Sequence, residues 1–317
     1  MTGRALIIGE ALVDVVHRLD GTVDEHPGGS PANVALGLGR LGRRVDLLTW
    51  LGRDAYGAVI SEHLAESGVH LVPGSDAAER TSVATATLDQ AGAASYDFQL
   101  EWRLPETDAL RADALEPAPL VVHTGSIAAV LPPGAADVAA LLAAARPVAT
   151  ITYDPNARPA LMGEPADAGA IIEPLVELAD VVKVSDQDLE WLYAGRKPIV
   201  VAREWAEWGP AVVVMTRGGS GAVAITSRGL EVEMLAPEVP VADTVGAGDS
   251  FMAGLIDGLW SAGLLGAERR EALHAIEPAV IAEVLAWCVR IAAITVSRPG
   301  ANPPSRAELD AQDTARD

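Results

Sequence analysis

The run Asp243-Thr244-Val245-Gly246-Ala247-Gly248-Asp249-Ser250-Phe251 constrains this chain more than any other segment. The apolar, helix-like segment from Phe251 to Leu259 follows, so the glycines mark a turn at the start of a helix. A helix start directs backbone N–H groups and positive potential at one point, which makes it a binding site for an anion. Asp249 lies at the edge of this anion hole. A base beside a phosphate-binding turn is what phosphoryl transfer to an alcohol requires.

The composition limits the cellular compartments and the classes of binding partner that we expect for this protein. The chain has 317 residues, 50% of them hydrophobic, which suffices for one large α/β domain or two smaller ones. Its net charge of −21 without a basic stripe makes nucleic acid and anionic membranes poor partners. The single cysteine, Cys288, excludes an internal disulfide framework, fits a reducing compartment and is expected to be buried. With no signal-peptide pattern and no apolar run of about 20 residues, we expect a cytoplasmic protein.

Short β-branched runs alternate with longer Ala/Leu-rich runs along the chain. This alternation predicts a doubly wound, mostly parallel sheet flanked by helices. The expected strands are Ala5–Ile8, Arg44–Thr49, Leu120–Thr124, Val148–Tyr153, Val181–Val184 and Ala211–Thr216. The expected helices are Ser30–Leu41, Ala55–Ser67, Gly134–Ala145, Ile171–Leu178, Asp186–Tyr193, Ile199–Trp208, Ser250–Ser261 and Glu277–Val296.

Two regions, Asp14–His26 and Thr81–Trp102, alternate polar and apolar residues instead. They predict an antiparallel β flap set off from the main sheet, with a hairpin turn at Asp89-Gln90-Ala91-Gly92. We therefore expect one α/β domain over residues 1–302, with flap strands within residues 10–27 and 80–103. The tail of residues 303–317 has two prolines and many charges, and we expect it to be frayed.

The segment Gly37-Leu38-Gly39-Arg40-Leu41-Gly42 matches the GxGxxG pattern of dinucleotide-binding sites. That fingerprint needs a strand immediately before its first glycine. Here the preceding residues predict a helix capped by Ser30, with Pro31 at its first position. We therefore interpret these glycines as helix-packing and helix-ending positions. An NAD-dependent oxidoreductase, which would depend on this pattern, is a weak alternative.

Two polar positions upstream are ambiguous when taken singly. The pair Gly28-Gly29 gives a tight loop that a small ligand can approach closely, and Asn33 follows one turn into the helix. Asp14 lies where the first strand leaves the sheet, and its carboxylate suits adjacent sugar hydroxyls. Alone, Asn33 fits a local cap and Asp14 an ordinary turn residue.

Taken together, the motifs resemble the PfkB (ribokinase-like) family of carbohydrate kinases. The first signature runs from Gly28 to Gly42 and continues to Leu51-Gly52-Arg53-Asp54-Ala55-Tyr56-Gly57, and the second is the Asp243–Asp249 run. Between and after them, in family order, come Asp154-Pro155-Asn156-Ala157-Arg158, Lys183-Val184-Ser185, Thr216-Arg217-Gly218-Gly219-Ser220-Gly221 and Arg298-Pro299-Gly300-Ala301. The resemblance covers residues 5 to about 302 and implies the ribokinase-like fold and an ATP-dependent sugar kinase.

The resemblance also implies a role for each matching residue. Asp249 is expected to be the catalytic base, with Gly246, Ala247 and Gly248 as the anion hole for the transferred phosphoryl group. The sugar is expected to contact Asp14, Gly28, Gly29, Asn33, Arg158 and Asp249; for Arg158, a salt bridge to Asp154 is the alternative. The expected nucleotide contacts are Ser185, Thr216, Gly218, Gly221 and Gly248.

The resemblance also implies metal ions, but the residues of this chain match the metal-binding motifs of the family only in part. Members often carry an Asn-x-x-Glu element that organises Mg²⁺ through water, where this chain has Ser185-Asp186-Gln187-Asp188. Asp188 is expected to take the place of the glutamate; it also fits a solvated helix position. Many members bind K⁺ beside the anion hole, and Asp243, Val245, Thr295, Arg298 and Gly300 match that pattern. Some relatives place a serine ligand where this chain has Pro304.

The form of the motifs looks most like fructokinases, with transfer to a sugar hydroxymethyl group. The alternatives are 2-keto-3-deoxygluconate kinase, which would need extra positive charge for a carboxylate, and ribokinase. A different class, a sugar or nucleotide sensor without catalysis, would have no need of Asp249. Because an exposed flap has edges and an apolar face, we expect two chains to pair through it as a homodimer.

Overall fold

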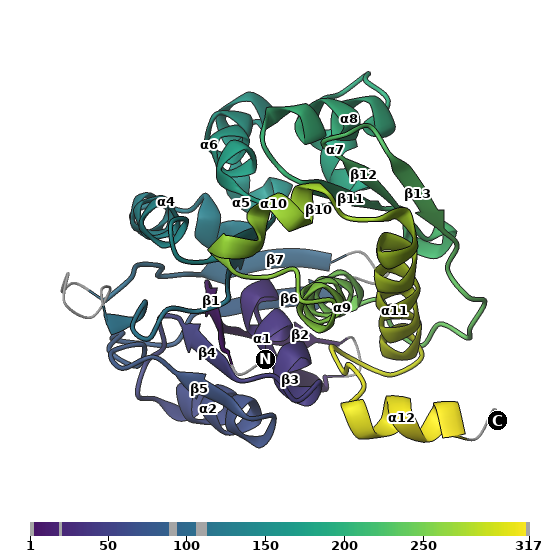
Figure 1. Cartoon of the computed structure of the whole chain (residues 1–317). Helices are drawn as coiled ribbons and strands as arrows, with labels where there is room; N and C mark the ends of the chain where they lie inside the picture. The colour runs from purple at the N-terminus through teal and green to yellow at the C-terminus, as the bar shows by residue number, and fades with distance from the viewer. Residues whose placement is uncertain (1–2, 19–20, 89–93, 106–112, 315–317) are drawn as a thin grey trace.

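A mixed, mostly parallel sheet forms the centre of the computed structural model, which describes residues 3–18, 21–88, 94–105 and 113–314 (Figure 1). Among these residues the sheet has nine strands in the order β13-β12-β11-β10-β9-β8-β1-β4-β5. The strands are β1 (Ala5–Ile8), β4 (Val45–Leu48), β5 (Val69–Leu71), β8 (Val121–Gly125), β9 (Thr150–Asp154), β10 (Val181–Ser185), β11 (Val212–Thr216), β12 (Ala222–Thr226) and β13 (Glu231–Met234). Only the pairings of β12 are antiparallel.

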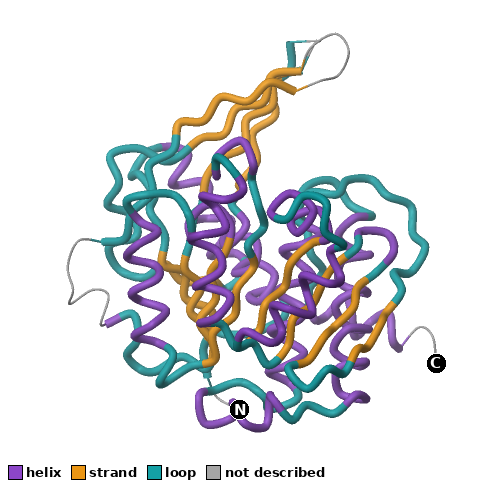
Figure 2. The backbone as a smooth tube through the Cα atoms, turned by 90° about the horizontal axis from the view of Figure 1, so that it is seen from above, coloured by secondary structure: helices purple, strands orange, loops and turns teal. Residues whose placement is uncertain are grey.

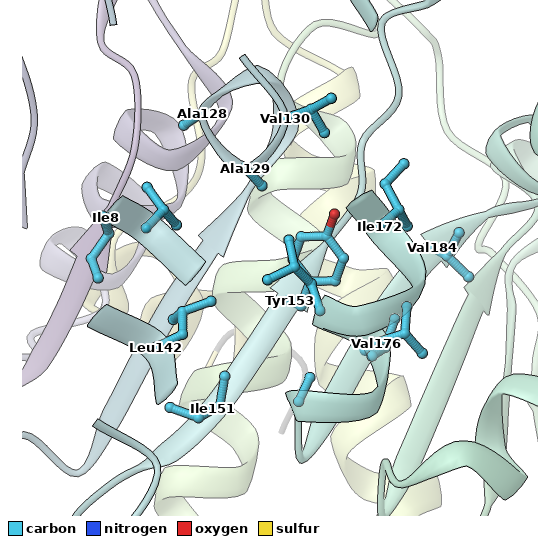
Figure 3. Close-up of a cluster of buried hydrophobic side chains, with 14 of the residues drawn as sticks. Ile8, Ala128, Ala129, Val130, Leu142, Ile151, Tyr153, Ile172, Val176 and Val184 are labelled. Carbon is cyan, nitrogen blue, oxygen red and sulfur yellow. The ribbon is translucent and has the colours of Figure 1, made fainter. Parts of the chain in front are cut away.

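Both faces of this sheet are covered by helices, because successive side chains of a strand point to opposite faces. Ala5 and Ile7 of β1 pack in one hydrophobic cluster with α1, α2, α9 and α11. Leu6 and Ile8 pack in a second cluster with α4, α6, α7 and α8, and Figure 3 shows part of this second cluster, including Ile8. The α-helices are α1 (Ser30–Arg40), α2 (Ala55–Glu66), α4 (Gly134–Ala145), α5 (Pro159–Met162), α6 (Pro165–Leu178), α7 (Asp186–Leu192), α8 (Pro198–Trp208), α9 (Ala247–Ser261), α10 (Arg270–His274), α11 (Pro278–Val296) and α12 (Arg306–Thr314). Short 3₁₀ turns are η1 (Ser126–Ala129), η2 (Gly218–Ser220) and η3 (Ala267–Arg269).

A smaller sheet projects from the body, as Figure 2 shows. Its strands are β2 (Leu12–His17), β3 (Val23–Gly28), β6 (Val83–Leu88) and β7 (Ala94–Gln99), in the order β3-β2-β6-β7. Two antiparallel hairpins, β2–β3 and β6–β7, are joined by a parallel pairing of β2 with β6. The flap expected from the sequence is confirmed, and its two halves come from the two predicted regions. The hairpin turn expected at residues 89–92 lies outside the described residues.

The glycines of the GxGxxG match serve helix packing, as the sequence predicts. A Cβ at Gly37 would lie 2.7 Å from Cβ of Ala253 on α9, and one at Gly39 would lie 2.2 Å from the carbonyl oxygen of Ser67. Gly42 follows the end of α1 with φ +78°, the left-handed conformation that closes helices. Since the pattern starts inside a helix rather than after a strand, the dinucleotide interpretation fails.

Helix α11 has the length and the apolar composition of a membrane span. In this structure it packs against α9 and against β12 and β13, as a core helix does. Gly254 of α9 allows this close approach, because a Cβ there would lie 3.2 Å from Cα of Cys288. Cys288 is fully buried, as expected, and burial raises the pKa of its thiol well above the ordinary value.

The segment after residue 302 differs from the expectation of a frayed tail, because it contains the helix α12. Leu309 is fully buried against Leu41 and Ile291. Arg306 donates a hydrogen bond to the buried carboxylate of Asp257 at 2.6 Å. Glu308 of the same helix pairs with Arg298 at 2.7 Å. One apolar side chain and two ion pairs thus dock a helix whose composition alone looks solvated.

Candidate active site

The predicted site residues gather at the carboxyl ends of the parallel strands. Strands β4 and β5 lie on one side of β1, and β8 to β11 lie on the other, so the order in which successive strands join the sheet reverses between β1 and β8. Ligands of open α/β sheets bind at such a switch point. The first turns of α1 and α9 meet there, together with the residues that follow β9.

Asp249 joins three segments that are distant in sequence. Its Oδ1 accepts hydrogen bonds from Ser30 Oγ at 2.7 Å and from Asn156 Nδ2 at 3.2 Å, and its Oδ2 accepts one from Asn33 Nδ2 at 2.8 Å. The residue is 6% exposed. These donors fix the carboxylate in one orientation at the start of α9. Oδ1 accepts two hydrogen bonds and Oδ2 accepts one, so Oδ2 keeps a lone pair for a further donor.

The first turn of α9 has the form of an anion hole. Gly246 is its N-cap with φ +73°, and a Cβ there would lie 2.6 Å from Cβ of Ala301. Within the described part of the chain, the backbone N–H groups of Gly248 and Asp249 donate to no backbone carbonyl, whereas that of Ser250 donates to Gly246 O at 2.8 Å. Free amides at a helix start, with the helix dipole behind them, attract a negative group.

A second polar cluster faces Asp249 from the smaller sheet. A Cβ at Gly28 would lie 2.1 Å from Oδ2 of Asp14, and one at Gly29, where φ is +101°, would lie 2.5 Å from the carbonyl oxygen of Glu10. Burial raises the pKa of Asp14, Arg158 counteracts this rise, and the negative charge of Asp249 adds to it. The charges of Asp14, Arg158 and Asp249 therefore act on one small space, as expected for a shared ligand.

The loop after β9 contributes Asn156, which the sequence prediction missed. Asn156 has φ +38°, and its side chain spans the site: Arg158 donates to its Oδ1 at 2.6 Å, and its Nδ2 donates to Ser30 Oγ at 2.6 Å. The alternative salt bridge from Arg158 to Asp154 is absent, since Asp154 pairs with Lys183 at 2.8 Å. The Asp-Pro-Asn run was the only signal for Asn156.

Ser30 also has a different role from the predicted one. The N-cap of α1 is Gly29, and Ser30 is the first helical residue. Its hydroxyl donates to Asp249 instead of accepting a hydrogen bond from an amide of its own helix. A long-range contact with a buried carboxylate thus replaces the local cap.

The residues predicted to hold the nucleotide lie at the ends of β10 and β11. Thr216 ends β11, and the following turn contains Gly218 with φ +51° and Gly221 with φ +89°. A Cβ at Gly221 would lie 2.0 Å from the carbonyl oxygen of Met234. Ser185 ends β10 and caps α7. Glycine is thus required where this turn passes close to the strand β13.

Asp188 is held by backbone amides. Its Oδ1 accepts from Ala157 N at 2.9 Å and its Oδ2 from Ser185 N at 3.1 Å, and Ser185 Oγ in turn accepts from Asp188 N. Only 8% of the residue is exposed, so it is not the solvated helix residue of the alternative interpretation. Among the described residues, no group of three or more His, Cys, Asp or Glu side chains is arranged to hold a metal ion.

The segments predicted to hold K⁺ lie side by side. The carboxylate of Asp243 accepts from Val245 N at 3.0 Å and from Gly300 N at 2.8 Å. Burial opposes ionisation of Asp243, but these backbone N–H groups outweigh it and lower its pKa. Asp243 N in turn donates to Val296 O at 3.2 Å. Thr295 and Arg298 belong to the same neighbouring segment, and Thr295 is fully buried.

Glu10 is a second residue that the sequence prediction left unused. It is 6% exposed at the switch point, and its Oε2 accepts from Ala128 N in η1 at 3.2 Å. Burial raises the pKa of its carboxyl to about 7, and hydrogen bonds from the backbone and from Ser126 limit the rise. A buried carboxyl therefore connects the turn after β1 with the turn after β8.

The family was identified by comparison with known proteins. The model of the pfkB family of carbohydrate kinases matches residues 3–308. The chain belongs to this family. It is 34% identical to a fructokinase of Klebsiella pneumoniae over 83% of this chain and 87% of that protein, and 30% identical to a fructokinase of Escherichia coli over 98% and 100%.

Solved structures agree with this assignment. A fructokinase double mutant from Vibrio cholerae, in a form bound to fructose, ADP and potassium ion, superposes with a TM-score of 0.77 at 26% identity, covering 98% of this chain and 97% of that one. This carbohydrate kinase therefore has the ribokinase-like fold that its motifs imply, and it is a sugar phosphotransferase. The oxidoreductase and sensor alternatives are not favoured.

Proposed function

We propose that this kinase transfers the γ-phosphoryl group of ATP to a hydroxymethyl group of fructose, with Asp249 as the base. The observation that carries the proposal is the placement of the Asp249 carboxylate at the first turn of α9, beside backbone amides that lack a carbonyl partner. A carboxylate in this position takes the proton of the attacking hydroxyl, while the amides bind the negative oxygens of the phosphoryl group.

The chemical step balances as follows. The hydroxymethyl proton passes to Asp249, the hydroxyl oxygen forms a bond to the γ-phosphorus, and the bond from that phosphorus to the leaving oxygen of ADP breaks. Most of the acceleration in such reactions comes from positioning and electrostatic stabilisation. Asp14, Asn33 and Arg158 orient the sugar, and Gly28 and Gly29 leave room for it.

Fructose is favoured by the relatives, which bear the name fructokinase. A 2-keto-3-deoxygluconate kinase would need a positive charge near the flap to bind the carboxylate of its substrate. Arg103 is the candidate for this role. It lies 4.8 Å above the ring of Trp50 and pairs with Glu101 at 3.4 Å. These contacts hold the guanidinium against the protein, so a neutral sugar suits the flap better.

ATP is the expected phosphoryl donor. We expect it to contact Thr216, Gly218, Gly221 and Ser185, and to place its terminal phosphate at Gly248. Mg²⁺ would neutralise the phosphates when bound. Each oxygen of Asp188 accepts one backbone N–H group, and its remaining lone pair would accept a hydrogen bond from a water molecule bound to the ion. K⁺ would be held by Asp243 and the carbonyls of Val245, Thr295, Arg298 and Gly300, where it would support the turn that contains Gly246.

The smaller sheet is proposed to close over the sugar and to pair two chains. Its hairpin β2–β3 carries Asp14 and leads directly into Gly28 and Gly29. Movement of this sheet would therefore deliver sugar-binding groups and exclude water, which competes with the sugar as acceptor. A monomer in sedimentation analysis would contradict the dimer. We also keep the proposal of a cytoplasmic location.

The test is release of ADP from Mg-ATP in the presence of fructose, ribose, 2-keto-3-deoxygluconate, tagatose and nucleosides, with K⁺ and with K⁺ replaced by tetramethylammonium. We expect the highest kcat/KM with fructose, and stimulation by K⁺. If another acceptor gives the highest value, the fructose assignment is wrong. If none exceeds the rate with water alone, the sensor interpretation is supported instead.

A further inference from the structure

A buried lysine lies beside the first turn of α9. The sequence contains two lysines, Lys183 and Lys197, and 21 arginines. Lys197 is exposed at the start of α8, whereas Lys183 is in β10 and only 4% of its side chain is exposed. A chain that uses arginine for almost every cation therefore has a lysine at this interior position.

The ammonium of Lys183 is packed against the anion hole. A Cβ at Gly248 would lie 3.0 Å from Nζ. The same Nζ donates to Oδ2 of Asp154 at 2.8 Å. An ammonium has three N–H groups, and within the described residues the bond to Asp154 is the one hydrogen bond that Nζ makes with protein. Two donors thus remain at the place where the proposed function brings the γ-phosphate.

The size and charge of the site suit an ammonium. A guanidinium is planar and larger, and it needs partners for five N–H groups, whereas the approach of Gly248 leaves little room. Burial disfavours the charge of Lys183, but the carboxylates of Asp154, Asp188 and Asp249 outweigh this effect and raise its pKa. The lysine is therefore a stable buried cation surrounded by more negative than positive neighbours.

We propose that Lys183 is a catalytic residue whose ammonium donates a hydrogen bond to the phosphoryl group during its transfer. The inference rests on the proposed function, because it uses the first turn of α9 as the phosphoryl site. In the transition state, charge spreads over the equatorial oxygens of this group. A preorganised cation in a site shielded from water stabilises that charge strongly.

A purely positioning role would run through a chain of hydrogen bonds. Lys183 holds Asp154, whose Oδ1 accepts from Asn156 N at 3.2 Å, and Asn156 Nδ2 donates to Asp249. If these hydrogen bonds were the whole role of Lys183, this lysine would affect catalysis only by positioning Asn156. The experiment must therefore separate contact with the nucleotide from support of Asn156.

Nuclear magnetic resonance of protein labelled with ¹³Cε,¹⁵Nζ-lysine gives that separation. The two lysines should produce two signals, which Lys197→Ala assigns, and Lys197 serves as an internal control. With fructose present, we expect a saturating non-hydrolysable Mg-ATP analogue to shift the Lys183 signal and leave the Lys197 signal unchanged. Adenosine should shift neither. An unchanged Lys183 signal under saturation verified by calorimetry would overturn the proposal, and this readout does not require turnover.

Kinetics supply the second test. Lys183→Met should lower kcat by about 10²- to 10³-fold, the range for loss of one transition-state donor, with KM for fructose within about threefold. The loss should persist when Asn156→Ala is already present. A loss that disappears in the Asn156→Ala background would show support of Asn156 only, and would contradict direct contact.

A second variant allows the kinetic test to be interpreted if Lys183→Met fails to fold. The double variant Lys183→Met, Asp154→Asn removes both charges, so no unpaired carboxylate is left buried. We expect it to fold and to have the same low kcat. Near-normal kcat in the folded double variant would overturn the proposal. An inactive wild-type enzyme with every sugar would instead contradict the proposed function, while the nuclear magnetic resonance result would stand on its own.

Discussion

Gly246→Ala tests whether the shape of the α9 start is required for activity. Gly246 has φ +73°, and an added Cβ would lie 2.6 Å from Cβ and 2.8 Å from Cα of Ala301. The left-handed conformation costs an alanine about 1–2 kcal/mol, and overpacking adds about 1–3 kcal/mol. Together they give about 2–5 kcal/mol. With an unfolding entropy of about 2.1 cal/mol/K per residue, a chain of 317 residues loses roughly 1.5 °C of Tm per kcal/mol.

We therefore expect Gly246→Ala to lower Tm by roughly 3–7 °C. We also expect kcat to fall by about 10²-fold or more, because the amides of the first turn are displaced. Gly195→Ala is the matched control: φ is +85° there, with no atom within 4 Å of the added Cβ. It should lose roughly 1.5–3 °C and keep its kcat.

Adding Ala301→Gly to Gly246→Ala removes the contact with Cβ of Ala301 and keeps the one with its Cα, so it should restore part of the packing loss. Differential scanning fluorimetry and steady-state kinetics on the wild type and the three variants measure these effects. The reasoning is refuted if Gly246→Ala and Gly195→Ala lower Tm equally and both keep full kcat.

Two further predictions concern stability. The pKa of Glu10 is about 7 in the folded protein, and its ordinary value is 4.5. The stability that its protonated carboxyl contributes is therefore fully present below pH 4.5 and is lost as the pH rises through about 7. Unfolding from pH 5 to 8 should therefore show the wild type losing about 2.5 kcal/mol of stability relative to Glu10→Gln. A constant difference would contradict the buried, protonated carboxyl. Leu309→Ala should cost about 2–5 kcal/mol because Leu309 is fully buried, whereas Asp310→Ala, at an exposed position, should stay within about 0.5 kcal/mol. Equal unfolding midpoints for these two variants would mean that α12 is not docked.

Local sequence patterns predicted the elements well where burial is regular. The strand Ala5–Ile8 and the helix Gly134–Ala145 have the predicted bounds, because apolar residues mark their whole length. The helix expected from Ile171 starts at Pro165 instead, since Pro at a first helical position is favourable while the polar first turn hides the apolar periodicity. The antiparallel strands β12 and β13 were not predicted, and Glu231–Met234 has exposed and half-buried residues only.

The candidate site was predictable to the extent that its residues lie in glycine-marked turns. Asp249, Gly246, Gly29 and Asn33 have signals of that kind. The hydroxyl of Ser30 and the ammonium of Lys183 do not, because their roles depend on partners 219 and 29 residues away in the sequence. The local pattern predicted that Ser30 caps its own helix. The fold shows instead that its hydroxyl donates a hydrogen bond to the carboxylate of Asp249.

The most direct test of the account is the rate of a single turnover by Asp249→Asn at saturating Mg-ATP and fructose. The change keeps the shape of the side chain and removes the base. We predict that the phosphoryl-transfer rate falls by about 10²- to 10⁴-fold, while calorimetry gives a Kd for fructose near that of the wild type. Phosphoryl transfer at the wild-type rate would contradict the central claim that this carboxylate accepts the proton of the sugar.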